Sequence, residues 1–287
     1  MPSVASDLLA LTKPRLSSLV LFTTAGGIYL APGSMSVTRV FVTLLATAGV
    51  VGAANALNEY MERDSDRFMP RTASRPLPAG RMEPAVALWF GIAIAAVCIP
   101  ALYFSANLLT AALAALAFFS YVLMYTPLKA RSHHAMLMGA LPGALPPLMG
   151  WTAKTGSVGA AGLILFAVLF FWQLPHFLAI ALFRKEEYAA AGLKSVPLVK
   201  GDAVARWQAV GYIVPLIAAS IALYVVHAAG MLYLIAAVVL GAALLAEAVY
   251  GIVKNAGHVW AKQLFLLSLV YLSGLFLALW IDGGVRV

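Results

Sequence analysis

The amino-acid sequence predicts an all-α, polytopic membrane protein with about nine transmembrane helices packed as one bundle. Of its 287 residues, 63% are hydrophobic and only 10% are charged, and the mean hydropathy is +0.92. Soluble domains contain about 45–50% apolar residues. Hydrophobic runs of about 20 residues, which is enough to cross a bilayer, recur along most of the chain. We therefore expect a single integral-membrane domain over residues 1–287.

The hydrophobic runs place the expected spans in order along the chain. The N-terminal residues lack the charged region and small-residue cleavage site of a signal peptide, so the first span is expected to remain. The first and fifth spans are short and rich in glycine or proline, and a re-entrant segment is the alternative at residues 139–150. With a window of about 19 residues, the spans cover residues 16–32, 38–60, 85–104, 108–126, 136–152, 160–182, 208–227, 230–250 and 263–281.

Basic residues predict the orientation of this bundle. With nine spans, 16 of the 19 Lys and Arg residues fall on one side of the membrane, and only Arg39, Lys154 and Arg286 on the other. Because cytoplasmic loops are enriched in Lys and Arg, we expect the N-terminus and the charged loops at the cytoplasmic face of the cell (inner) membrane. The net charge of +8 is spread over short loops beside the bilayer, so it does not predict nucleic-acid binding.

A charged cluster follows the second expected span. Asn58, Glu62 and Asp66 are four residues apart, which on an α-helix places their oxygen atoms on one stripe. Acids add little to orientation and are costly near hydrocarbon, so they need another explanation. Mg²⁺ takes one or two protein carboxylates and completes its shell with water and phosphate oxygens. The stripe therefore predicts a Mg²⁺ site, and Asp64 serves a second ion or a basic neighbour.

Arginines follow the acidic stripe within one turn and loop. Arg67, Arg71 and Arg75 offer paired donors to phosphate oxygens, so the cluster as a whole predicts a diphosphate site. The alternative is a set of i, i+4 or i, i+3 ion pairs on a solvated helix end. That alternative is weakened here because the cluster adjoins a span with almost no other polar residue.

These residues carry a family resemblance. The pattern N-x-x-x-[DE]-x-x-x-D followed by R-T-x-x-R-P-L resembles the first signature of the UbiA superfamily of membrane aromatic prenyltransferases. Residues 125–151 and 170–201, with G-A-x-P-P-x-x-G-W and W-Q-x-P-H-F, resemble segments of its protoheme IX farnesyltransferase (haem O synthase) branch. The resemblance covers roughly half the chain directly. It implies a UbiA-like bundle and Mg²⁺-dependent transfer of a farnesyl group from farnesyl diphosphate to a vinyl group of haem B.

The resemblance also implies roles for the cluster. Asn58, Glu62 and Asp66 would hold the Mg²⁺–diphosphate, while Arg71 and Arg75 would neutralise the departing oxygens so that the allylic C–O bond can ionise.

The sequence departs from the family's pattern in two motifs. Glu62 stands where Asp is usual, and Arg184 and Tyr188 occupy the positions of a later D-x-x-x-D motif, which puts a second metal in doubt. We expect Lys185 to help bind diphosphate, and Glu187 to act as a secondary ligand or to orient Lys185. The alternative for this stretch is a solvated run of charges.

Histidines are candidates for the haem site. His176 lies near mid-span, where an ionisable residue is a functional hypothesis by default, and neutral imidazole suits iron. The alternative is a histidine bonded to a carbonyl freed by Pro175. His133 and His134 are expected near the haem propionates or iron. The remaining expected substrate-binding residues are Tyr125, Lys129, Trp172 and Phe177.

The implied partners are farnesyl diphosphate and haem B as substrates, the lipid bilayer, and a haem-handling membrane protein such as haem A synthase or an oxidase assembly factor. Three alternatives stay open. Another UbiA-type enzyme would use a quinone precursor or chlorophyllide. A transporter would place its polar site at the midplane of paired repeats. A non-catalytic haem-binding protein would not need the acids and arginines.

Overall fold

The structure, a computed structural model, describes residues 3–282, and the ordered elements within that range are helices, with no β-strand. A π-helical segment, Ser120–Tyr125, joins α5 to α6. The α-helices are α1 Val4–Leu11, α2 Pro14–Leu30, α3 Val37–Asp66, α4 Pro84–Ser105, α5 Leu108–Phe119, α6 Thr126–Leu128, α7 Ala135–Thr155, α8 Ala160–Phe183, α9 Lys185–Ala190, α10 Val196–Val199, α11 Asp202–Val225, α12 Met231–Val253 and α13 His258–Asp282.

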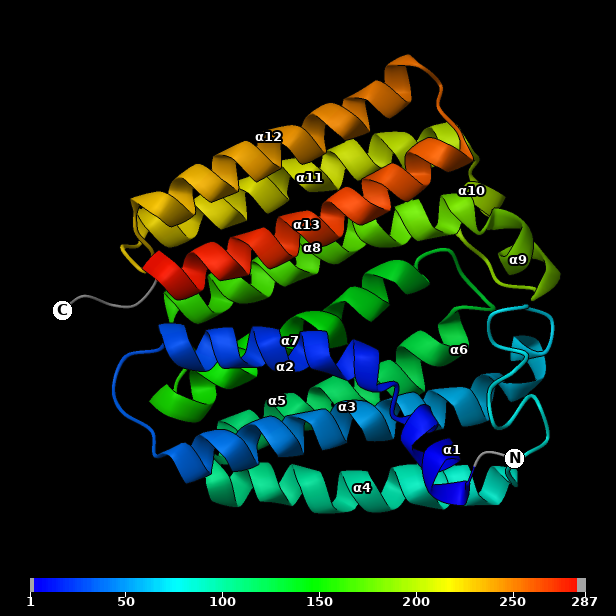
Figure 1. Cartoon of the computed structure of the whole chain (residues 1–287), viewed down its shortest axis with the longest axis horizontal. Coiled ribbons are helices and arrows are strands. Elements are labelled where there is room, and N and C mark those ends of the chain that lie inside the picture. Colours follow the sequence, from blue (N-terminus) through cyan, green and yellow to red (C-terminus); the bar gives the residue numbers. More distant parts are fainter. Residues whose placement is uncertain (1–2, 283–287) are drawn as a thin grey trace.

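The long helices lie side by side as one bundle in two halves (Figure 1). Helices α2 to α7 form one half, in which α3 packs on α4 and α2 packs on α7. Helices α8, α11, α12 and α13 form the other half. Because α7 packs against both α2 and α8, it joins the halves. The all-helical membrane bundle predicted from the hydrophobic runs is confirmed.

Among residues 3–282, seven helices are long and apolar enough to cross a membrane: α3, α4, the continuous run from α5 to α6, α8, α11, α12 and α13. They coincide with seven of the nine predicted spans. Helix α2, with a shorter apolar segment at Leu16–Leu30, and helix α7 occupy the places of the predicted first and fifth spans. The count of nine therefore stays a prediction.

Helix α7 is continuous from Ala135 to Thr155 although it contains Pro142, Pro146 and Pro147. The re-entrant alternative for this stretch is thus not observed. Proline is tolerated in membrane helices when neighbouring groups satisfy the freed backbone carbonyls. The small residues of α7 also allow its backbone to approach α2, because a Cβ at Gly150 would collide with the backbone oxygen of Thr24.

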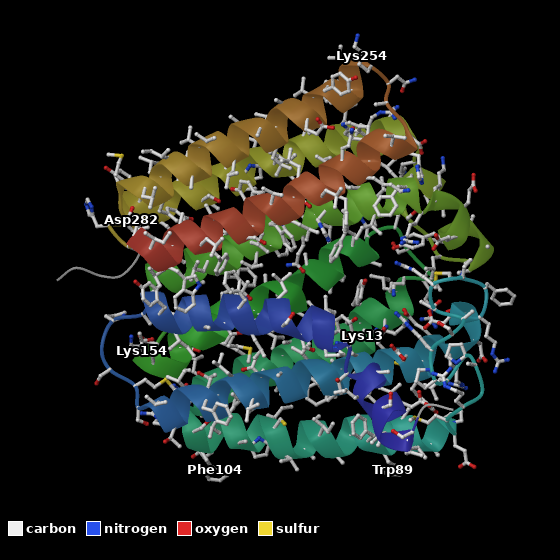
Figure 2. The ribbon with its side chains drawn as sticks, viewed as in Figure 1. Lys13, Trp89, Phe104, Lys154, Lys254 and Asp282 are labelled. Carbon is white, nitrogen blue, oxygen red and sulfur yellow. The ribbon has the colours of Figure 1, made fainter. Side chains whose placement is uncertain are left out.

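Charged residues gather at one end of the bundle. Lys13 and Lys254 lie at that end, and Lys154 and Asp282 lie at the opposite end (Figure 2). The loop from residue 67 to residue 83 and helices α6 and α9 share the end that carries Lys13 (Figure 1). Segments far apart in sequence therefore meet where α3 leaves the bundle.

The close approach of α2 and α7 predicts a specific cost for Gly27→Ala. A Cβ there would collide with the backbone oxygen of Pro147, so the helices must separate, which costs about 1–3 kcal/mol. Thermal unfolding of the detergent-solubilised protein measures this loss. Gly211→Ala is the matched control, because a Cβ at that helical glycine meets nothing within 4 Å. Equal melting temperatures for the two variants would contradict the packing described.

Candidate active site

The predicted acidic stripe lies where α3 leaves the bundle, and its side chains turn inward. Asn58 is buried, and its Nδ2 donates to Thr126 Oγ1 at 3.2 Å. Asp66, the last residue of α3, is only 1% exposed. Glu62, one turn earlier, is partly buried. The helical spacing that the sequence predicted therefore does bring these oxygens to one face.

Two of these acids are paired with basic residues from other elements. Lys129 Nζ, just after α6, lies 2.7 and 2.9 Å from the two carboxylate oxygens of Glu62. Arg75 Nη1 donates to Asp66 Oδ2 at 2.7 Å. The loop of residues 67–83, here called the arginine loop, follows α3. A hydrogen bond of 2.7 Å from the Thr72 hydroxyl to the backbone oxygen of Asp66 fixes its start. The carboxylates are thus compensated, as their burial requires.

Glu59 is a member of this cluster that the sequence analysis missed. Its side chain is 2% exposed, and its Oε1 lies 3.4 Å from Arg75 Nε and 3.6 Å from Lys13 Nζ. Lys13 also donates to Asn58 Oδ1 at 3.1 Å. Burial and the nearby charge of Arg75 lower the pKa of Lys13 to about 8, although the negative charge of Glu59 acts to raise it. In the sequence analysis Lys13 counted only among the basic residues that predict the orientation of the bundle, whereas the structure places it in this cluster.

The donor set fits Mg²⁺–diphosphate. No group of three or more His, Cys, Asp or Glu side chains within residues 3–282 is arranged around a metal position. Magnesium needs fewer, since one or two carboxylates suffice when water and substrate oxygens complete its octahedron. Glu62 and Asp66, with the amide oxygen of Asn58, meet that description. The basic groups that now pair with these acids are donors that phosphate oxygens also accept.

Asp64 and Arg67 lie outside this cluster. The Asp64 side chain is 73% exposed, and Arg63 Nη2 is 3.9 Å from its Oδ2. Of the two roles expected for Asp64, the structure shows the basic neighbour. Arg67 is exposed after the end of α3. Neither residue lies on the inward face of the stripe. Asp64 comes two residues before Asp66 and Arg67 one residue after it, so each points in another direction around the helix.

Helix α9 contacts the arginine loop through one ion pair. Arg71 Nε lies 3.7 Å from Glu187 Oε2, and Arg184 donates to the other Glu187 oxygen at 2.6 Å. Lys185 instead donates to Asp202, at the start of α11, at 2.7 Å. Glu187 therefore does not orient Lys185, because Asp202 supplies the nearer acceptor. Arg71 and Glu187 are brought together, whereas Lys185 is directed elsewhere.

A cavity of about 540 Å³ lies inside the bundle and adjoins the cluster at Tyr125, whose ring is 5.3 Å from Lys129 Nζ. Tyr125, Trp172, His176 and Phe177 line it, as the sequence predicted for substrate-binding residues. Tyr121, which the sequence analysis missed, lines it too, with its ring 5.1 Å from that of Tyr125. Both tyrosines lie on the π-helical segment, a feature frequent at functional sites. The volume falls in the range of about 300–1,000 Å³ typical of ligand sites.

One polar residue of the cavity has an unsatisfied hydrogen-bond donor. Asn55 lines the cavity, is 2% exposed, and its Nδ2 has no hydrogen-bond partner among the described residues. An unpaired buried amide is costly, so this group is suited to an acceptor on a bound molecule. It lies one turn before Asn58 on α3 but does not belong to the i, i+4 stripe, which is why the pattern did not reveal it.

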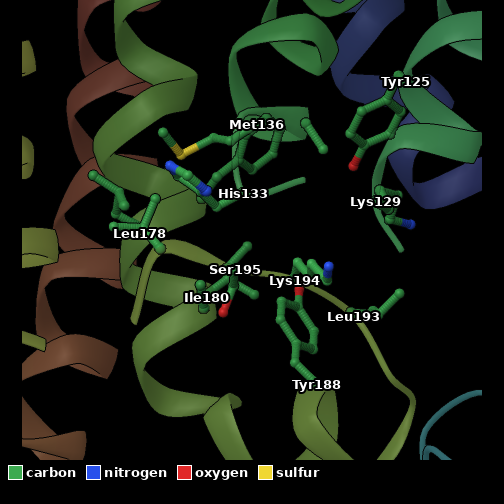
Figure 3. Close-up of a pocket in the computed structure, with 14 residues that line it drawn as sticks. Tyr125, Lys129, His133, Met136, Leu178, Ile180, Tyr188, Leu193, Lys194 and Ser195 are labelled. Atoms are coloured by element: carbon green, nitrogen blue, oxygen red, sulfur yellow. The ribbon is translucent and has the colours of Figure 1, made fainter. Parts of the chain in front are cut away.

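A smaller cavity of about 90 Å³ adjoins the large one and shares Tyr125 and Phe177 with it. Lys129, His133 and Lys194 line it, as Figure 3 shows. Burial, together with His134 and Lys200, lowers the pKa of His133. The His134 ring lies 4.1 Å from that of His133, tilted against it, and is not part of the lining.

His176 is held in the cavity wall by α13. Its Nδ1 is 2.7 Å from Ser268 Oγ, and its ring stacks on Trp172 and lies tilted against Phe265, each 4.7 Å away between centroids. The alternative in which this histidine bonds a carbonyl freed by Pro175 is not observed, because its recorded partner is a hydroxyl on another helix.

Comparison with known proteins identifies the family. The model of the UbiA prenyltransferase family matches residues 19–270. The chain belongs to the UbiA prenyltransferase family. Two similar relatives of this UbiA chain are named protoheme IX farnesyltransferase. That of Myxococcus xanthus (strain DK1622) is 62% identical, covering 100% of this chain and 97% of the relative. That of Anaeromyxobacter dehalogenans (strain 2CP-C) is 54% identical, covering 96% and 93%.

Solved structures share the UbiA fold at low identity. A digeranylgeranylglyceryl phosphate synthase structure aligns with a TM-score of 0.82 at 17% identity, covering 96% of each chain. A UbiA homolog from Archaeoglobus fulgidus, bound to DMAPP and Mg²⁺, aligns with a TM-score of 0.70 at 17% identity, covering 96% of this chain and 100% of that chain. The predicted UbiA-like bundle is thereby confirmed.

The buried pairing predicts that Asp66→Asn destabilises this UbiA chain while Asp64→Asn does not. The first change leaves Arg75 facing a neutral amide beside Glu59 and costs about 1–3 kcal/mol, whereas an exposed site changes stability by less than about 0.5 kcal/mol. Ligand-free thermal unfolding in detergent measures both. Equal melting temperatures would show that the Asp66 pair contributes nothing to the folded state.

Proposed function

We propose that this chain is a protoheme IX farnesyltransferase that transfers the farnesyl group of farnesyl diphosphate to a vinyl group of haem B and so makes haem O. The observation that carries the proposal is a cluster of acids and cations, among them Glu62 and its partner Lys129, that adjoins a largely apolar, aromatic-lined cavity at Tyr125. Relatives that bear this name over nearly the whole chain support it. No comparable arrangement is needed by a protein that only binds haem.

The diphosphate would bind at the end of α3. Asn58, Glu62 and Asp66 would hold Mg²⁺, which when bound neutralises charge on the leaving diphosphate. Arg71 and Arg75 donate to its oxygens in this proposal, and preorganised donors of this kind are the usual main source of catalysis. Arg75 already contacts Asp66 at 2.7 Å, so it is placed to share its guanidinium between acid and substrate.

The cavity would hold the farnesyl chain and the porphyrin. The allylic C–O bond breaks with its electron pair going to the diphosphate, and the vinyl carbon of haem B forms the new C–C bond. Aromatic rings such as Tyr121, Tyr125 and Trp172 line the cavity, stabilise a cation by cation–π contact and exclude water while it exists. Water then adds to the porphyrin-side cation and loses a proton, which leaves the hydroxyl group.

We further propose that the protein lies in the cell inner membrane with its charged end in the cytoplasm, and that it delivers product to a haem-handling membrane protein such as haem A synthase. The enrichment of Lys and Arg in loops at one end supports this orientation. Lys254→Cys and Ser157→Cys, each in a Cys98→Ala background, should react with an impermeant maleimide from opposite sides. Labelling of both from outside intact spheroplasts would contradict the proposal.

The farnesyl transfer is tested by pigment analysis of membranes supplied with haem B, farnesyl diphosphate and Mg²⁺. Wild type should form a farnesylated haem, and removal of Mg²⁺ or Asp66→Ala should lower its rate by about a hundredfold or more. Asp64→Ala, on the same turn but exposed, should retain the wild-type rate. Prenylation of a phenolic acid in place of haem would keep the family's chemistry and overturn the substrate.

Lys13 predicts a pH dependence of diphosphate binding. Its pKa of about 8 in the ligand-free protein means that its ammonium charge is present below pH 8 and lost above it. A bound anion favours the charged form, so affinity should fall by up to about tenfold as pH rises through 8. Lys13→Arg, whose charge persists, should bind with a flat profile over that range. The charged groups around Lys13 are Glu59, Glu62, Arg75 and Lys129.

A further inference from the structure

Ser268 on α13 makes two hydrogen bonds through one hydroxyl group. Its Oγ lies 2.6 Å from the backbone oxygen of Phe265, one turn earlier, and 2.7 Å from Nδ1 of His176 on α8. Its own backbone oxygen accepts a 2.7 Å bond from Trp172 Nε1. Ser268 is fully buried, so no solvent competes with these bonds, and the serine joins α13 to the cavity wall.

This arrangement fixes the tautomer of His176. Two oxygen atoms 2.6 Å apart need a proton between them, and the Phe265 carbonyl has none, so the serine proton lies on that bond. Ser268 Oγ is then an acceptor toward the imidazole, and Nδ1 must carry the hydrogen. In a neutral imidazole the other nitrogen, Nε2, consequently has the free lone pair.

The lone pair of Nε2 is left for a ligand. His176 lines the large cavity, and within residues 3–282 its recorded hydrogen bond is the one made by Nδ1. The stacked ring of Trp172 and the tilted ring of Phe265, each 4.7 Å away between centroids, limit rotation of the imidazole. A neutral imidazole whose second nitrogen donates to an oxygen acceptor is the arrangement found in protein metal sites, and imidazole is a good ligand for iron.

We propose that Ser268 is a positioning residue that holds His176 as the Nδ1–H tautomer, so that Nε2 binds the iron of the porphyrin substrate. The inference rests on the proposed function for the identity of the iron compound as haem B. It assigns the orienting role to α13, which lies outside the motifs of the sequence. Ser268 touches neither substrate in this proposal and acts only through the imidazole.

The test is haem titration of the purified protein in detergent, followed by absorption and electron paramagnetic resonance spectra. Wild type should show the signature of an axial imidazole. His176→Ala should lose it and recover it when free imidazole is added. Ser268→Ala keeps the backbone bond to Trp172 but frees the imidazole, and should bind haem about 10–100-fold more weakly.

Ser220→Ala is the matched control. Ser220 is also fully buried, donates to the backbone oxygen one turn earlier at 3.0 Å and contacts a second polar group, Tyr271 OH, at 2.7 Å. Neither Ser220 nor Tyr271 is part of the cavity lining, and Ser220 does not contact His176, so its loss should leave the haem spectrum and affinity unchanged. An equal change in Ser220→Ala and Ser268→Ala would overturn the positioning role.

Farnesyl transfer, measured on the same samples, separates this inference from the proposed function. Wild type that makes farnesylated haem without an axial-imidazole signature would overturn the inference and leave the function standing. A signature that depends on both His176 and Ser268, in a protein that farnesylates nothing, would support the inference and overturn the function. Ser268→Ala with wild-type haem affinity would overturn the inference in either case.

Discussion

The structure depends on the neutralisation of carboxylates that are buried where α3 leaves the bundle. Glu59 and Asp66 are almost completely buried, and a buried acid that loses its partner costs about 1–3 kcal/mol. Arg75 contacts both acids, which requires the loop after α3 to fold back over the helix end. Lys13 brings the start of α2 to Glu59. The cations that the fold needs are therefore also the donors that a diphosphate needs.

Periodicity predicted the parts of this arrangement that are local. Hydrophobic runs gave the long helices, and four-residue spacing gave the inward face of Asn58, Glu62 and Asp66. The sequence pattern did not reveal Glu59, because this residue lies off that stripe. Its buried charge is compensated by Lys13, 46 residues earlier in the chain, and by Arg75. Such long-range pairs leave no local pattern.

The cavity shows the same division between local and long-range information. Short motifs identified residues such as Trp172 and His176, because those segments resemble a family. The role of Ser268 arises only when α13 packs on α8, since a serine in an apolar run has no signal of its own. Tyr121 lies four residues before Tyr125 on the π-helical segment and lines the cavity with it, but it stands outside the motifs that carry the family resemblance.

The central claim is that the acids at the end of α3 bind diphosphate through Mg²⁺. Equilibrium binding of farnesyl thiodiphosphate, an analogue that ionises poorly, to the purified wild type, Glu62→Gln and Asp66→Asn proteins tests it most directly. The account predicts tight wild-type binding only with Mg²⁺, and a loss of about tenfold or more, or about 1.4 kcal/mol, in each variant. Equal affinity with and without Mg²⁺, or in all three proteins, would contradict it.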